Sequence, residues 1–156
     1  MRKIARVSIL AITSFMLSIQ AYAANEKLVF ALDLVRHGDR SPYDSLPAAP
    51  HEWSEGEGQL TARGMQQEYH LGLKLHQRYV VDNALLSATY TPGSIYVRST
   101  DYDRTIMSAQ SAMLGLYPLG SGPDSPALPS RFQPVPFHSV PASQDGAFLI
   151  DIGNEK

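Results

Sequence analysis

The feature that most constrains the fold is an apolar run, Leu28–Val35, that ends abruptly in the polar stretch RHGDR at positions 36–40. The run has the length and the residue types of a buried β-strand. The polar stretch therefore lies where a strand ends and a loop begins. In open α/β sheets this is the place where ligands bind, so the pattern predicts an α/β fold with a site directly after its first strand.

Two amphipathic helices and a second strand are expected further along the chain. Thr61 is expected to cap the first helix, Ser94–Arg98 is typical of the second strand, and the second helix ends near Pro118. The apolar faces predicted from three- and four-residue spacing are Met65, Tyr69, Leu73, His76 and Val80 on the first helix, and Ile106, Met107, Ala109, Met113 and Leu114 on the second. Prolines limit Val135–Val140 to an edge or an isolated strand. The alternation of strands and helices predicts a mainly parallel sheet covered by helices.

The N-terminus has the three parts of a secretory signal peptide. A basic segment, Met1–Arg6, precedes an apolar segment, Val7–Ile19, and a small-x-small cleavage pattern stands at positions 21–23. The apolar segment is shorter than the roughly 20 residues that a membrane span needs, which favours a cleaved signal over an anchor. We therefore expect residues 1–23 to be removed and residues 24–156 to be exported, to a bacterial periplasm or beyond.

The composition of the chain limits the kinds of molecule and metal that it can bind. The 156 residues carry a formal net charge of -2, so no excess of positive charge points to nucleic acid. The chain has no cysteine, which excludes a disulfide and a thiolate metal site. Hydrophobic residues make up 44% of the chain, a share that is typical of a globular domain.

The side chains around His37 suit a phosphate group. Arg36 and Arg40 supply two guanidinium groups that match the oxygens of a phosphate, and Gly38 lets a ligand approach the backbone. His37 is the one group in the cluster that can act as a nucleophile near neutral pH. Taken alone, such a cluster would more often be a solvated loop or a structural feature than a site.

A second basic cluster follows the second expected strand. Arg98 lies at the end of that strand, and Arg104 lies in the first turn of the next helix. A helix N-terminus adds free N–H groups and a partial positive charge, which favour a bound anion. We expect Arg104 to turn toward the same phosphate, and Asp101 and Asp103 to cap the helix.

Five short motifs follow one another along the chain. They are Arg36-His37-Gly38-x-Arg40-x-Pro42, Gln59-Leu60-Thr61-x-x-Gly64, Arg98-Ser99-Thr100-Asp101-x-Asp103-Arg104-Thr105, Met107-Ser108-Ala109 and Pro134-x-Pro136-x-His138-x-Val140-Pro141. In this order and at these distances they resemble the histidine acid phosphatases, above all the prostatic and lysosomal type. The likeness runs from about Leu28 to Leu149. It implies a three-layer α/β/α fold of the phosphoglycerate mutase-like kind.

The resemblance also implies a function, which is the hydrolysis of phosphate monoesters at acid pH through a phosphohistidine on His37. Arg36, Arg40 and Arg104 would bind the phosphate oxygens, and neither a metal nor a cofactor is implied. Arg98 matches a family position that we interpret as structural before catalytic. The implied partner is a small-molecule phosphomonoester, with neither nucleic acid nor a membrane, and the oligomeric state is not predicted.

The chain departs from the family pattern in one respect. In the family, a His-Asp or His-Glu pair far downstream binds phosphate and protonates the leaving oxygen, in a chain more than twice this length. The only His-Asp or His-Glu pair of neighbouring residues in this sequence is His51-Glu52, which lies in the loop before the first expected helix. We therefore expect residues 24–156 to form the N-terminal part of the domain, with the C-terminal half absent and the general acid beyond Lys156. The alternative function is a catalytically inactive phosphate-binding remnant, whereas the export signal argues against a cytosolic mutase.

Overall fold

The computed structural model describes residues 26–44, 47–48, 51–124 and 128–146. The predicted signal peptide, residues 1–23, lies outside the described residues. The chain divides into two compact units, one ending at Ala31 and one beginning at Leu32, and every helix and strand below belongs to the second. Within the described ranges, no helix combines the length and the apolar character needed to cross a bilayer.

Helix α2 (Ala62–His76) begins where the sequence predicts. Thr61 has an extended backbone, and its hydroxyl accepts a hydrogen bond from the Gly64 amide at 3.1 Å. This bond satisfies one of the amides that a helix N-terminus leaves unpaired. Beyond His76 the chain continues as a π-helical segment, η1 (Gln77–Asp82), in which the buried Tyr79 hydroxyl donates to the Asp33 carboxylate at 3.0 Å.

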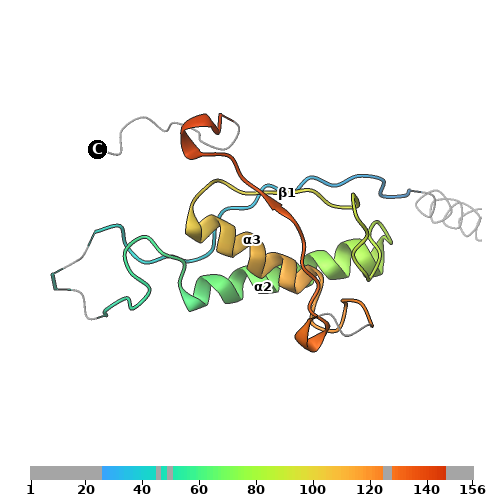
Figure 1. The fold of residues 1–156 in the computed structure, drawn as a ribbon, viewed down its shortest axis with the longest axis horizontal. Helices are drawn as coiled ribbons and strands as arrows, with labels where there is room; N and C mark the ends of the chain where they lie inside the picture. The colour runs from blue at the N-terminus through green and yellow to red at the C-terminus, as the bar shows by residue number, and fades with distance from the viewer. Residues whose placement is uncertain (1–25, 45–46, 49–50, 125–127, 147–156) are drawn as a thin grey trace, which may run out of the picture. The chain divides into compact units, whose positions relative to one another are not determined.

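Helix α3 (Asp103–Leu116) packs against α2 (Figure 1). The predicted capping of this helix by Asp101 and Asp103 is wrong, because the cap position is Tyr102, which makes no side-chain cap hydrogen bond. The side chain that caps a helix usually belongs to the N-cap residue, and the two aspartates stand one residue to either side of it. Asp101 instead accepts a hydrogen bond from the Ser139 hydroxyl at 3.3 Å.

Small residues form the closest contact between α2 and α3, whereas the residues predicted from spacing are half-buried, apart from the exposed Leu73. The buried residues of the two helices are Gly64, Glu68 and Gly72 on α2, and Ser108, Ala112, Gly115 and Leu116 on α3. A Cβ added to Gly72 would collide with the Ala112 carbonyl, and one added to Gly115 would collide with the Tyr69 carbonyl. Leu73, on the predicted face, is 37% exposed. Because glycine lets two backbones touch, it sets the helix contact although it carries no apolar side chain.

Strands β1 (Val97–Arg98) and β2 (Phe137–His138) pair in parallel, with Val97 opposite Phe137 and Arg98 opposite His138. The parallel pairing and the α/β class are confirmed, and the proline-limited segment does form a short edge strand. β1 is shorter than predicted. The buried centre of the adjoining core comprises Leu116, Tyr117 and Val135, with Leu75, Leu86, Tyr90, Ile95, Val97 and Met113 packed against it.

The predicted first strand, Leu28–Val35, is not a strand in the structure. Its apolar side chains are largely exposed, Leu32 by 86% and Leu34 by 81%. A strand exists only through hydrogen bonds to a neighbouring strand, and none of the described segments pairs with this one. An apolar run shows that a segment is suited to burial, but it does not supply the partner that buries it.

Candidate active site

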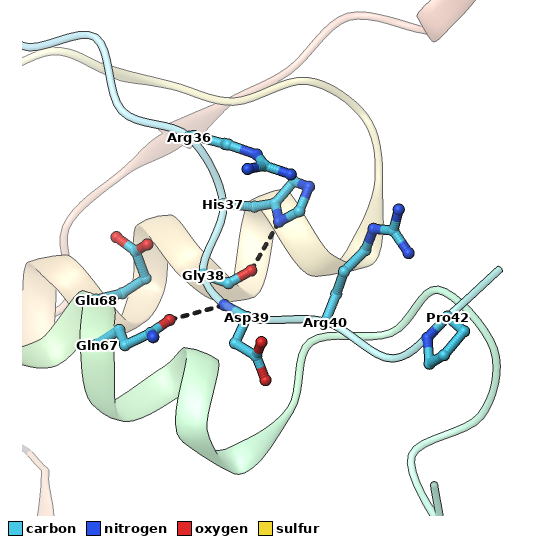
Figure 2. A pocket seen from close by; sticks show the side chains of 8 residues that line it. All are labelled: Arg36, His37, Gly38, Asp39, Arg40, Pro42, Gln67 and Glu68. Atoms are coloured by element: carbon cyan, nitrogen blue, oxygen red, sulfur yellow. Dashed lines mark hydrogen bonds between the residues drawn. The ribbon is translucent and has the colours of Figure 1, made fainter. Parts of the chain in front are cut away.

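Two backbone amides attach the turn after His37 to the helices. The Gly38 amide donates to Ser108 Oγ of α3 at 3.1 Å, and the Asp39 amide donates to Gln67 Oε1 of α2 at 2.9 Å. Figure 2 shows the second of these bonds. Because both helices hold the same turn, the position of His37 depends on how α2 and α3 pack against each other.

The same turn also lies backbone to backbone on the first turn of α2. A Cβ added to Gly38 would lie 2.5 Å from the Gly64 carbonyl oxygen, and one added to Gly64 would lie 2.8 Å from the Asp39 nitrogen. Thr61, which caps α2, donates its hydroxyl proton to Asp39 Oδ2 at 2.8 Å. The two glycines and the cap residue therefore hold the turn at a fixed distance from the helix.

The chain beyond the turn is anchored just before α2. Arg40 forms an isolated antiparallel bridge with Leu60, and the Ser41 amide donates to the Gln59 carbonyl at 2.9 Å. The Arg40 guanidinium donates through Nη1 to the Ser41 carbonyl at 2.8 Å. Arg40 is thus fixed both by its backbone bridge to Leu60 and by the hydrogen bond of its guanidinium group.

The hydrogen bond of the His37 ring decides which ring nitrogen can react. Nδ1 lies 2.8 Å from the Gly38 carbonyl oxygen (Figure 2). A carbonyl oxygen can only accept, so the ring proton is assigned to Nδ1. In the neutral ring the lone pair is then on Nε2, which is the nitrogen that can attack an electrophile.

A pocket of about 510 Å³ opens at this turn (Figure 2). Its lining comprises Arg36, His37, Gly38, Asp39, Arg40, Pro42, Gln67 and Glu68. The volume falls in the range of small-molecule sites. Three of the four residues singled out in the sequence, Arg36, His37 and Arg40, therefore line one pocket, whereas Arg104 does not line it.

Arg104 nevertheless lies near Arg40, because both side chains contact Tyr43. The guanidinium carbon of Arg40 is 3.6 Å from the centroid of the Tyr43 ring, and that of Arg104 is 5.4 Å from it. An aromatic face attracts a cation without neutralising its charge. Within the described ranges neither arginine forms an ion pair with a carboxylate, so both positive charges remain available to an anion.

Arg98 behaves as a structural residue, in agreement with the expectation. Its Nη2 lies 2.8 Å from Asp145 Oδ1, and the Asp145 side chain is fully buried. A buried carboxylate needs a charged or hydrogen-bonding partner. Arg98 therefore connects β1 to the segment after β2.

Sequence reasoning missed the residues that support the turn and line the pocket from the helices. These are Gln67 and Glu68 of α2. Ser108, which was named only as part of a motif, and Tyr43, in the loop after the turn, were assigned no role. Glu68 is only 6% exposed, and burial raises the pKa of its carboxyl above the ordinary value because the charged form loses its water. One signal could have identified it, since Glu68 stands four residues after Gly64 and four before Gly72, on the same helix face.

The fold and the pocket together define an α/β protein that presents a histidine between two arginines at a turn held by two helices. Comparison with known proteins gives the family. A model of the histidine phosphatase superfamily, branch 2, matches residues 27–154, and the chain belongs to this family. The predicted resemblance is thereby confirmed.

Individual relatives agree with the family. The chain is 42% identical to the lysosomal acid phosphatase of Bos taurus over 134 residues, which are 81% of this chain and 30% of that protein. It is 38% identical to the prostatic acid phosphatase of Bos taurus over 153 residues, 96% of this chain and 38% of that protein. The crystal structure of a Klebsiella sp. ASR1 phytase matches 74% of this chain and 28% of its own, with a TM-score of 0.55 and 30% identity. The chain thus spans about a third of the length of these relatives.

Proposed function

We propose that the chain hydrolyses phosphate monoesters at acid pH through a phosphohistidine on His37. The observation that carries the proposal is the hydrogen bond from His37 Nδ1 to the Gly38 carbonyl, which leaves the Nε2 lone pair in a pocket that Arg36 and Arg40 also line. Relatives that bear the name acid phosphatase support the same chemistry.

The proposed reaction has two steps. His37 Nε2 attacks phosphorus in line, the bond from phosphorus to the leaving oxygen breaks, and its electron pair goes to that oxygen, which takes up a proton. Water then attacks phosphorus, the P–N bond breaks with its electron pair returning to Nε2, and the proton of the water is released. The Nδ1–H bond to the Gly38 carbonyl stabilises the positive ring between the two steps. We place the proton donor for the leaving oxygen beyond Lys156, as the family pattern implies.

The arginines supply the charge that the transition state needs. Phosphoryl transfer passes through a loose transition state in which negative charge is spread over the three non-bridging oxygens. Arg36 and Arg40 line the pocket, and Arg104 approaches the Tyr43 ring that Arg40 also contacts. We propose that the three guanidinium groups bind these oxygens and hold phosphorus in line with Nε2.

The substrate and the location follow from the same proposal. The substrate is a small-molecule phosphomonoester, whose phosphate is the part that the pocket recognises. Residues 1–23 act as the export signal, so that hydrolysis takes place in the periplasm or outside the cell. Neither nucleic acid nor a membrane takes part.

The test measures turnover and phosphate binding on residues 24–156. The leaving group of an aryl phosphate needs little protonation, so we expect slow hydrolysis at acid pH even without the general acid beyond Lys156, and loss of that hydrolysis in His37→Ala. His70→Ala is the matched control, because His70 is an exposed histidine on α2 and its removal should change nothing. A folded chain that binds phosphate without turnover would support the inactive phosphate-binding alternative. A folded chain that neither binds phosphate nor turns over the ester would contradict both functions.

A further inference from the structure

Glu68 is a buried acid on the wall of the His37 pocket (Figure 2), and the proposed reaction does not use it. Its side chain belongs to the face of α2 that also carries Gly64 and Gly72, and 6% of the residue is exposed. The Oε2 atom is buried and has no hydrogen-bond partner. Buried polar atoms without a partner are rare in native proteins, and each one requires an explanation.

The surroundings of Glu68 favour its neutral form. The titratable and charged groups of the packed elements are Arg36, His37, Asp39 and Arg40 on the pocket turn, and Asp103 and Arg104 in the first turn of α3. None of these groups forms an ion pair or a hydrogen bond with Glu68. Burial is the one cause that raises its pKa. A neutral carboxyl can donate a hydrogen bond, whereas a carboxylate can only accept one.

We propose that protonated Glu68 donates a hydrogen bond to a non-bridging oxygen of the phosphoryl group bound at His37, and that its ionisation weakens phosphate binding. The inference rests on the proposed function and makes Glu68 a phosphate-binding residue of the same site. The arginines attract the anion at every pH. Glu68 makes phosphate binding depend on pH. When Glu68 is ionised it cannot donate a hydrogen bond, and its negative charge repels the phosphate oxygens.

The proton of Glu68 stays on the carboxyl throughout. Glu68 is therefore not the group that protonates the leaving oxygen, and the proposed reaction still needs its separate general acid. Glu68 instead makes the site bind phosphate more tightly at acid pH, and this effect comes before any bond is broken.

The experiment measures the Kd of inorganic phosphate for residues 24–156 between about pH 4.5 and pH 7.5. Glu68→Gln keeps a hydrogen-bond donor of the same shape at every pH and cannot ionise. Glu68→Ala removes the donor. Glu55→Gln, at an exposed position outside the pocket, is the matched control and should bind as the unchanged chain does. Phosphate itself also changes its ionisation over this range, but it does so equally for all variants, so the difference between variants isolates Glu68.

We expect Glu68→Ala to bind phosphate on the order of tenfold more weakly at pH 4.5, as the loss of one hydrogen bond to a charged group predicts. Glu68→Gln should bind well at pH 4.5 and should lose less affinity than the unchanged chain as the pH rises. If Glu68→Gln has the pH profile of the unchanged chain, the inference is wrong even though phosphate binds. If the unchanged chain is folded but binds no phosphate at any pH, the proposed function fails and this inference fails with it. Should Glu68→Ala not fold, the comparison of the profiles of Glu68→Gln and the unchanged chain still decides.

Discussion

Gly64→Ala is expected to displace the His37 turn without changing any charged or reacting group. A Cβ at this position would lie 2.7 Å from Leu60 Cδ1 and 2.8 Å from the Asp39 nitrogen, and closer still to the Asp39 carbonyl oxygen. Ordinary contacts of a Cβ begin at about 3.4 Å, so the Asp39 backbone has to move by roughly 0.6 to 1.2 Å, since interiors are close-packed. One residue, Gly38, separates Asp39 from His37, and the displacement passes along the backbone to the ring.

The effect on the site should exceed the effect on stability. Overpacking costs about 1–3 kcal/mol of unfolding free energy, but alanine favours a helix over glycine by up to about 1 kcal/mol, so the net loss is about 1 kcal/mol. A displacement of about 1 Å at a reacting centre can cost about 10²-fold in rate. We therefore expect turnover to fall by about 10²-fold, and phosphate affinity to fall with it, in a chain that remains largely folded.

The assay combines the Kd of inorganic phosphate, aryl phosphate turnover and denaturation by urea. Gly146→Ala is the neutral control, because a Cβ there meets nothing within 4 Å. Val135→Ala is the stability control, because Val135 is buried in the core with Leu116 and Tyr117 and does not line the pocket. The reasoning is refuted if Gly64→Ala binds phosphate as tightly as the unchanged chain. It is equally refuted if Val135→Ala, measured where it is folded, weakens binding as much.

Two further outcomes follow from the same contacts. Tyr43→Leu should weaken phosphate binding about fivefold, because it removes the ring against which the Arg40 guanidinium lies and which Arg104 also approaches. Tyr43→Phe should keep the affinity, and equal losses in both variants would show that the ring face is not the cause. Because the pKa of Glu68 is raised in the folded chain, the unfolded chain loses the Glu68 proton at a lower pH than the folded chain does. The unfolding free energy should therefore fall between the ordinary carboxyl pKa, about 4.3, and the higher folded value. Glu68→Gln should remove that part of the slope in urea denaturation at several pH values, and an unchanged slope would contradict the assigned burial effect.

The sequence by itself determined what depends on neighbours along the chain. Thr61 and Gly64 stand three residues apart, so the cap of α2 could be predicted. The order of the motifs led to the family, which the family model confirms over residues 27–154. The placement of Arg36, His37 and Arg40 at one turn is equally local, and these three residues do line one pocket.

Only the tertiary structure decided what depends on distances between remote segments. The contact of α2 with α3 follows glycines, which carry no hydrophobic signal, so the fully buried residues of α2 each lie one position before a predicted one. The same shift buries Glu68, a residue that a hydropathy pattern assigns to solvent. The run Leu28–Val35 was predicted as a strand because its residues suit burial, yet pairing requires a second strand at hydrogen-bonding distance. Local spacing can specify a cap or a motif, whereas burial and pairing are properties of two segments and depend on how closely their backbones approach.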